Sequence, residues 1–135
     1  MAAVSVLKQV SVFVENRPGR LRSMLQALYD HEINIRALSI ADTSDFGIVR
    51  MILSDTEMGV KALREAGLTA SITDVLRVEF PDTPGALLKC AVEPLSVAGL
   101  NVEYIYAFVD TPTEKAAAVL KVNDTQGGVR VLGGK

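Results

Sequence analysis

The sequence predicts an α+β fold made of two similar units, each an antiparallel sheet with its helices on one face. Three observations lead to this prediction: an internal repeat, alternating apolar residues typical of strands, and three- or four-residue apolar spacing typical of helices. RPGRL recurs as TPGAL, INIRAL as LNVEYI, and SDTEMGVKAL as NDTQGGVRVL, at offsets of 66, 67 and 69 residues. Such ordered matches indicate a duplicated unit.

Each unit is expected to begin with a strand that turns through a Pro-Gly pair into a helix. Apolar residues alternate along the first strand of each copy: Val10, Val12 and Val14, matched by Leu76, Val78 and Phe80. The following apolar stripes predict an amphipathic helix that ends near residue 31 in the first copy. These stripes are Leu21, Met24, Leu25 and Leu28 in the first copy, and Leu88, Ala91, Val92 and Leu95 in the second.

The remaining elements complete the order βαββαβ, the split βαβ or ferredoxin-like unit. In the first copy we expect strands over residues 33–41, 48–53 and 68–73, with a helix capped by Ser54 and Asp55 and ended by Gly67. In the second copy we expect strands over residues 100–109 and 116–122 and a helix ending at Leu132.

Two departures from the repeat carry predictions. The second unit has one extra residue between its Pro-Gly turn and the next strand, together with Pro94, which predicts a π-bulge or kink near residues 92–94. The second unit also has no room for its last strand, which leaves residues 75–80 as an open edge. Residues 3–7, a partner chain or further native sequence could cover this edge.

The domain division follows from the repeat. The first unit is expected over residues 1–73 and the second, truncated unit over residues 74–135. Because only Asp74 separates two predicted strands at the boundary, we expect the units to pack as one rigid body.

Composition excludes several classes of function. The chain has 135 residues, 49% of them hydrophobic, but no apolar run long enough to span a membrane and no signal peptide, so a cytoplasmic location is expected. A net charge of −2 without a basic cluster argues against nucleic-acid binding. Cys90 and His31 are the sole cysteine and histidine, so we expect no metal site and no cofactor.

The repeated residues resemble those of the ACT domains, amino-acid-binding regulatory modules of biosynthetic enzymes. The resemblance lies in ENRPGRL after a strand and in the Ile33-Asn34 pair that opens the next strand, and it covers residues 7–132. It implies a tandem ACT protein that is not an enzyme. Such a protein would sense a free amino acid between ACT units and modulate a partner enzyme or pathway. The ENRPG stretch looks most like a serine-sensing ACT module, although Val14 stands where that module has histidine.

The turn from strand to helix through Pro18 and Gly19, here called the corner, also has a physical rationale as a ligand site. Pro18 suits the first helical turn, Gly19 lets a ligand approach the backbone, and free amides at the helix start can hold a carboxylate. The resemblance implies that Asn34 contacts the ligand from a neighbouring unit. In the second copy Asp82 replaces the first asparagine, so the two sites should differ. The candidate ligand-binding residues are Asn16, Arg17, Pro18, Gly19, Arg20, Leu21, Asn34, Ile35, Asp82, Gly85, Ala86 and Asn101.

Two other functions and one interface are also compatible with the sequence. A structural or interaction subunit without a ligand fits the same pattern. An acylphosphatase-like hydrolase shares the topology, with Arg20 and Asn34 in catalytic roles, although the proline-containing loop does not match that family. Alternation places Phe13, Ile48 and Ile52 on the sheet face away from the helices, which predicts a homodimer or packing against an enzyme.

Overall fold

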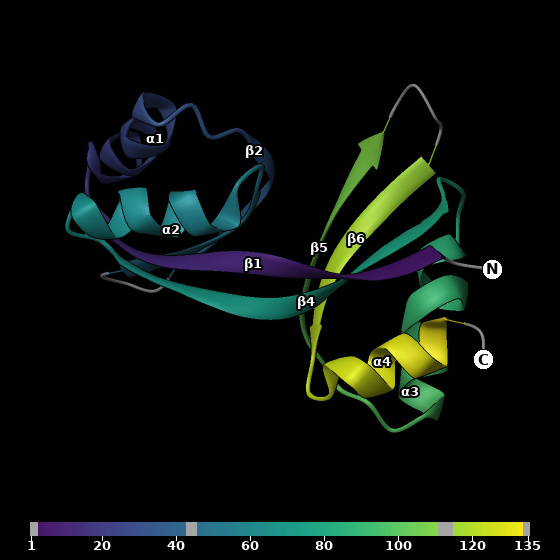
Figure 1. Cartoon of the computed structure of the whole chain (residues 1–135). Coiled ribbons are helices and arrows are strands. Elements are labelled where there is room, and N and C mark those ends of the chain that lie inside the picture. The colour runs from purple at the N-terminus through teal and green to yellow at the C-terminus, as the bar shows by residue number, and fades with distance from the viewer. Residues whose placement is uncertain (1–2, 43–45, 111–114, 134–135) are drawn as a thin grey trace. The chain divides into compact units, whose positions relative to one another are not determined.

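The computed structural model describes residues 3–42, 46–110 and 115–133. Its elements are β1 (Ala3–Glu15), α1 (Arg20–Asp30), β2 (Ile35–Asp42), β3 (Phe46–Leu53), α2 (Thr56–Glu65), β4 (Thr69–Pro81), the π-helical turn η1 (Leu88–Val92), α3 (Glu93–Val97), β5 (Val102–Asp110), β6 (Lys115–Val122) and α4 (Thr125–Leu132) (Figure 1). The strands form a six-stranded antiparallel sheet in the order β2-β3-β1-β4-β6-β5. The predicted α+β fold is therefore confirmed.

The chain divides into two compact units, here called the first unit (Lys8–Thr73) and the second unit (Met1–Leu7 with Asp74–Lys135). The long strands β1 and β4 each contribute to both units. Residues 69–81, expected as two strands that meet at Asp74, form one continuous strand.

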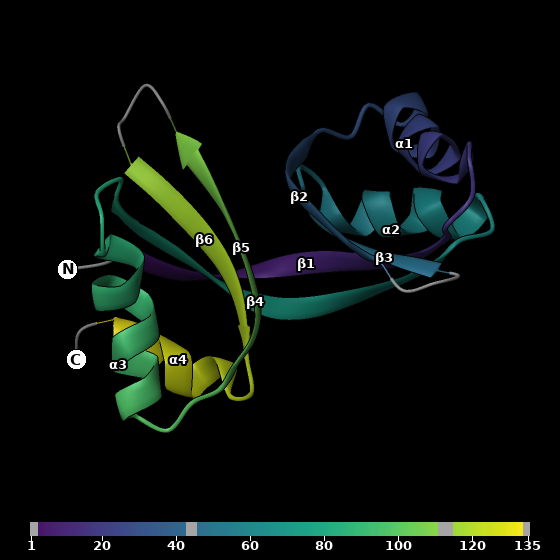
Figure 2. The same ribbon diagram turned by 180° about the vertical axis from the view of Figure 1, so that it is seen from behind.

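The first unit encloses its own core beneath α1 and α2, which lie on one face of its strands (Figure 2). The alternation of Val10, Val12 and Val14 turns these three side chains inward, and all are buried. From the helices, Met24, Leu28 and Leu63 reach the same core. In the register of β1 with β3, Val14 lies opposite Gly47 and Glu15 opposite Phe46.

Of the two residues expected to cap helix α2, only Asp55 does so, whereas the Ser54 hydroxyl accepts a hydrogen bond from the Asn34 amide. Asp55 is the N-cap, and its side chain accepts a hydrogen bond from the Met58 amide at 3.1 Å. Gly67 follows the helix with φ +88°, a conformation that suits glycine. Asp124 caps α4 in the same way, accepting from the Gly127 amide at 3.0 Å. The two helices thus share one starting device.

The second unit is completed by the beginning of the chain. Strand β1 neighbours β4 in the sheet, and Val4 packs against the second core, which is formed by Leu76, Val78, Leu95, Leu120 and others. Residues 3–7 thus cover the edge that the missing last strand would leave open. They are the first of the three covers considered from the sequence.

The predicted irregularity in the second unit's first helix is confirmed as a π-helical turn. It occupies Leu88–Val92, just before Pro94, and the Glu93 amide donates to the Leu88 carbonyl five residues back. Wider hydrogen bonds of this kind absorb one extra residue without breaking the helix. The following segment α3 continues to Val97.

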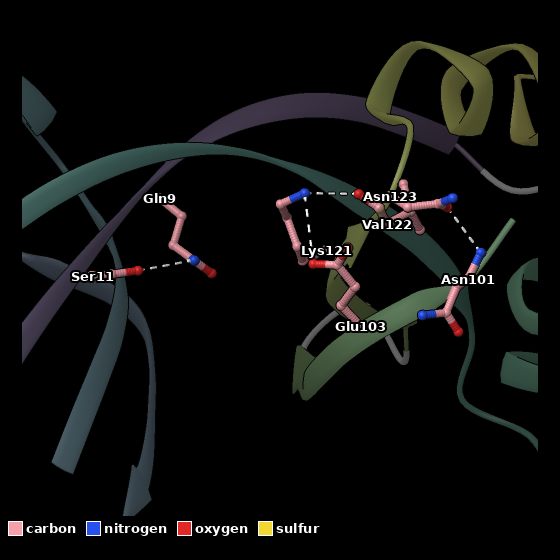
Figure 3. A network of polar contacts seen from close by, with 7 residues as sticks. All are labelled: Gln9, Ser11, Asn101, Glu103, Lys121, Val122 and Asn123. Atoms are coloured by element: carbon pink, nitrogen blue, oxygen red, sulfur yellow. Dashed lines mark hydrogen bonds and ion pairs between the residues drawn. The ribbon is translucent and has the colours of Figure 1, made fainter. Parts of the chain in front are cut away.

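The outer face of the first unit is less uniform than alternation suggests. Phe13 is 52% exposed and Ile48 is half-buried, but Ile52 is only 8% exposed. The prediction that the Ile52 side chain is exposed on this face is therefore wrong. In the same unit, Gln9 is fully buried and donates to the Ser11 hydroxyl at 3.4 Å (Figure 3).

Candidate functional site

The corner between β1 and α1 is built by backbone hydrogen bonds. The Arg17 amide donates to the Glu15 carbonyl at 2.8 Å, and the Arg20 amide donates to the Arg17 carbonyl at 3.2 Å. Gly19, the N-cap residue, has φ +87° and no atom within 4 Å of the place where a Cβ would lie. A side chain would therefore be strained here by its backbone conformation alone.

This corner leaves amides at the start of α1 without partners. The first intrahelical acceptor, the Gly19 carbonyl, is taken by the Ser23 amide at 3.0 Å and by the Ser23 hydroxyl at 3.0 Å. Among the described residues, no hydrogen bond uses the amides of Leu21 or Arg22. Such amides, at the positive end of the helix dipole, are suited to hold an anion.

A hollow of about 150 Å³ lies beside this corner, within the first unit. Its walls combine apolar side chains of the sheet with the polar corner: Val14, Glu15, Asn16, Arg17, Leu21, Ile40, Gly47 and Val49. A dry cavity of about 150 Å³ in another protein holds one benzene molecule, so this volume suits a ligand with about six heavy atoms.

Two cations of the corner have different surroundings. Arg20 is paired with Glu15, with its Nε 3.0 Å from the carboxylate, and both side chains are nearly half exposed. Arg17 is exposed and has no partner in the described part of the chain. Asn16 is also exposed, and its side-chain amide makes no hydrogen bond among the described residues. Arg17 and Asn16 are therefore the polar side chains of this corner that can meet a ligand.

The structure places Asn34 and Ile35 at the other end of the same sheet. Glu15 lies opposite Phe46 at one end of β3, whereas Ile35 lies opposite Leu53 at the other end. These positions are seven residues apart along β3, or about 23 Å at roughly 3.3 Å per residue. The two groups of candidate residues in one unit cannot contact the same small ligand.

The backbone of Asn34 has a structural role, but its side chain does not. The Asn34 amide donates to the Ser54 hydroxyl at 2.9 Å, and the Ser54 amide donates to the Asn34 carbonyl at 2.8 Å. We call this pair of bonds the latch. The exposed Asn34 side chain makes no hydrogen bond among the described residues, so it stays available.

The second unit repeats the corner in its backbone. The Thr83 amide donates to the Pro81 carbonyl at 2.9 Å, the Ala86 amide donates to the Thr83 carbonyl at 3.1 Å, and Gly85 has φ +82°. Ala86 is buried in the second core, while Asp82 is exposed. The backbone is thus repeated here around different side chains.

The second unit also repeats the latch. The Asn101 amide donates to Oδ1 of Asn123 at 2.9 Å, and the Asn123 amide donates to the Asn101 carbonyl at 3.2 Å (Figure 3). Nearby, Lys121 Nζ donates to the Val122 carbonyl at 2.8 Å and lies 3.9 Å from the Glu103 carboxylate. The Asn101 side chain points away from Asn123 in Figure 3, and Asn101 is exposed, as Asn34 is.

Comparison with known proteins now identifies the family. A family model described as an ACT domain pair matches residues 5–132. The chain belongs to the ACT domain pair family. This ACT pair is 38% identical to protein BT0572 from Bacteroides thetaiotaomicron, with a TM-score of 0.90 over 96% of this chain and 88% of that one. No curated protein sequence matches it.

More distant structures share the fold of the ACT pair. The ligand-free regulatory subunit of aspartate kinase from Thermus thermophilus has a TM-score of 0.70 at 18% identity, over 98% of this chain and 95% of that one. The corresponding subunit from Thermus flavus has a TM-score of 0.67 at 18% identity, over 98% of this chain and 94% of that one. These chains therefore have the same tandem architecture.

The hollow of the ACT pair includes residues that sequence reasoning did not select. They are Val14, Glu15, Ile40, Gly47 and Val49. Gly47 offered a signal, because a glycine inside a strand often marks close approach of a ligand or of another backbone. Val14 and Glu15 directly precede the corner in the sequence. Ile40 and Val49 read as ordinary strand residues, and only the register of β1, β2 and β3 brings them to the corner.

The hydrolase alternative loses its geometric basis in this ACT pair. Arg20 and Asn34 lie at opposite ends of the sheet, and Arg20 is paired with Glu15. Within residues 3–42, 46–110 and 115–133, no group of three or more histidine, cysteine, aspartate or glutamate side chains is placed to hold a metal ion. Over the same ranges no helix is long and apolar enough to cross a bilayer.

Proposed function

We propose that this ACT pair is a regulatory protein without enzymatic activity that binds a small free amino acid at the corner Asn16–Leu21. The observation that carries the proposal is the coincidence of two features at that corner. The unpaired amides of Leu21 and Arg22 begin a helix, and a hollow of about 150 Å³ with apolar walls lies beside them. Amides of this kind suit a carboxylate, and an apolar hollow suits a short side chain.

Arg17 and Asn16 supply the remaining polar groups. Arg17 adds positive charge near the carboxylate, since its guanidinium has no partner in the described part of the chain. The side-chain oxygen of Asn16 can accept a hydrogen bond from the ligand ammonium. Such a set recognises both ends of a zwitterion.

The position of Asn34 supports a site shared between two copies of the chain. Strand β2 is at the edge of the sheet, with Leu38 and Ile40 exposed on it. If β2 pairs antiparallel with β2 of a second copy, the start of one strand lies beside the end of the other. The Asn34 side chain of one copy then approaches the corner of its partner. A homodimer assembled in this way places ligand and interface together.

Such a site gives regulation a physical basis. A ligand that contacts both copies binds their associated form more tightly, so it shifts the population toward that form. We propose that a metabolic enzyme responds to this shift as the partner of the ACT pair. The aspartate kinase regulatory subunits of the two Thermus species have the same fold, which supports a regulatory partner rather than a reaction of the chain itself.

Thermal shift followed by calorimetry with the twenty amino acids tests the proposal. A ligand at 100 times its Kd is expected to stabilise the protein by about 2.7 kcal/mol. Asn34→Ala should weaken binding about tenfold or more, because a hydrogen bond to a charged group is removed. The matched variant Asn101→Ala serves as the control. If no amino acid stabilises the chain, or if Asn34→Ala and Asn101→Ala act alike, the proposed site is wrong.

A further inference from the structure

The two units differ at the second cross-strand pair from their corners, next to the pairs of Glu15 with Phe46 and of Pro81 with Lys115. In the first unit Val14 of β1 lies opposite Gly47 of β3. At the same place in the second unit, Phe80 of β4 lies opposite Ala116 of β6. At both positions of this pair the second unit has the larger residue.

The next pair changes in the opposite direction. Ile40 lies opposite Val49 in the first unit, and their counterparts Ala107 and Ala118 lie opposite each other in the second. Of these two pairs, the second unit therefore has its larger residues in the pair closer to the corner and its small residues in the pair farther from it, whereas the first unit has the reverse order. The Phe80 ring is 8% exposed and belongs to the second core together with Ala116 and Ala118.

The charge of the two corners differs in the same sense. The first corner carries Arg17 without a partner, next to Asn16. The second carries Thr83 and the exposed carboxylate of Asp82 at these positions. Arg17 attracts a ligand carboxylate and Asp82 repels one, while Glu15 of the first corner is paired with Arg20 and Lys115 lies opposite Pro81 beside the second corner. Steric and electrostatic differences thus act together.

We infer that Phe80 closes the second unit to the ligand, so that each chain binds one amino acid, in the first unit only. This inference rests on the proposed function and adds its stoichiometry and a specificity-determining residue. The first unit then binds the ligand. In the second unit the Phe80 side chain occupies the corresponding space next to the corner.

Calorimetry on the full chain tests the inference with substitutions that exchange the two units. Val14→Phe gives the first unit the residue of the second and should weaken amino-acid binding roughly 10- to 100-fold. Gly47→Ala is the milder variant. Its Cβ would lie 3.7 Å from the Ala41 carbonyl and from Ile40 Cγ2, so it fits without strain, and we expect a loss on the order of threefold. Circular dichroism melts establish that both variants fold.

The matched control is Phe80→Val, which should leave the affinity of the wild-type site unchanged. One ligand per chain in the wild type, together with loss in Val14→Phe, supports the inference. Two ligands per chain, full affinity in both Val14→Phe and Gly47→Ala, or loss of binding in Phe80→Val would overturn it while the amino-acid sensor stands. Absence of binding by any amino acid to the wild type would overturn the sensor and the inference together.

Discussion

The two halves of the repeat agree in their backbone and differ in their side chains. Both turn from strand to helix through a glycine with positive φ, and both fasten the next strand with a latch, Asn34 with Ser54 and Asn101 with Asn123. The side chains around these devices have diverged in size and charge. The comparison shows that the backbone of the corner forms with different side chains around it. The size and charge of those side chains, not the backbone, distinguish the two corners.

The first helices of the two units show how much variation the scaffold tolerates. Helix α1 is a regular helix of 11 residues. Its counterpart is α-helical at residues 86–87, passes through a π-helical turn of five residues and continues as a short α-helix. One extra residue has been absorbed inside the helix while the corner before it and the latch after it are kept. Matched substitutions in the two units can test how far this equivalence extends.

The largest effect is expected where each second helix approaches its sheet through a glycine. A Cβ added at Gly128 would lie 2.6 Å from Leu76 Cδ1, and one added at Gly59 would overlap Leu53 Cδ1. Gly59→Ala and Gly128→Ala should each cost about 1–2 kcal/mol, since overpacking outweighs the gain in helix propensity. Urea unfolding measures the loss. The exposed neighbours Glu57→Ala and Gln126→Ala are the controls, with changes within about 0.5 kcal/mol.

The helix caps should give the next largest effect, and it should be equal in the two units. Asp55→Ala and Asp124→Ala each remove the side-chain acceptor of a first-turn amide, at a cost of about 1 kcal/mol. Replacement by Asn should retain most of the stability, because its oxygen can accept the same bond. Hydrogen exchange with mass spectrometry should locate the loss in α2 or in α4. If one of these substitutions lowered the protection from exchange in both units, the two caps would not act independently.

The acceptor residues of the two latches, Ser54 and Asn123, can be exchanged between the units. Ser54→Ala and Asn123→Ala remove the acceptor for the Asn34 or Asn101 amide, which should cost about 0.5–1 kcal/mol at these exposed positions. Ser54→Asn and Asn123→Ser, which carry each residue to the other unit, should cost less than the alanine variants in thermal melts. Equal costs for exchange and truncation would show that the two latches are not equivalent.

The ion pair beside the first corner should contribute least. Arg20 Nε lies 3.0 Å from Glu15, and the two side chains are 45% and 44% exposed. Solvent screens such a pair, so Arg20→Ala should change stability by no more than about 0.5 kcal/mol, and less at high salt. The second unit already has alanine, Ala86, at this position. A double-mutant cycle with Glu15→Ala measures the coupling, and a coupling above about 1 kcal/mol would contradict this assessment.

The fold could be predicted from the sequence because its signals are local and repeated. Apolar alternation placed Val10, Val12 and Val14 in the core, and Asp55 with Gly67 predicted where α2 begins and ends. The extra residue and Pro94 together predicted the π-helical turn, which ends two residues before the proline. In each case the residues that predicted the feature lie within one short segment of the sequence.

The site could be predicted only in part, because its walls come from segments distant in the sequence. The corner residues were visible as a motif, but Ile40, Gly47 and Val49 join them only through strand register. The pairing of Arg20 with Glu15 depends on how the turn directs two long side chains. Ile52 was expected on an open face and is buried, since alternation assigns a side chain to a face but does not say what covers that face.

The shared strand β1 makes the order of synthesis matter. Residues 3–7 are synthesised before residues 74–133, yet they complete the unit that those later residues form. Pairing over so large a sequence separation is slow. Residues 3–7 must therefore avoid misassociation until residues 74–133 have been made, and a break in the chain between α2 and β4 would leave each unit without one of its strands.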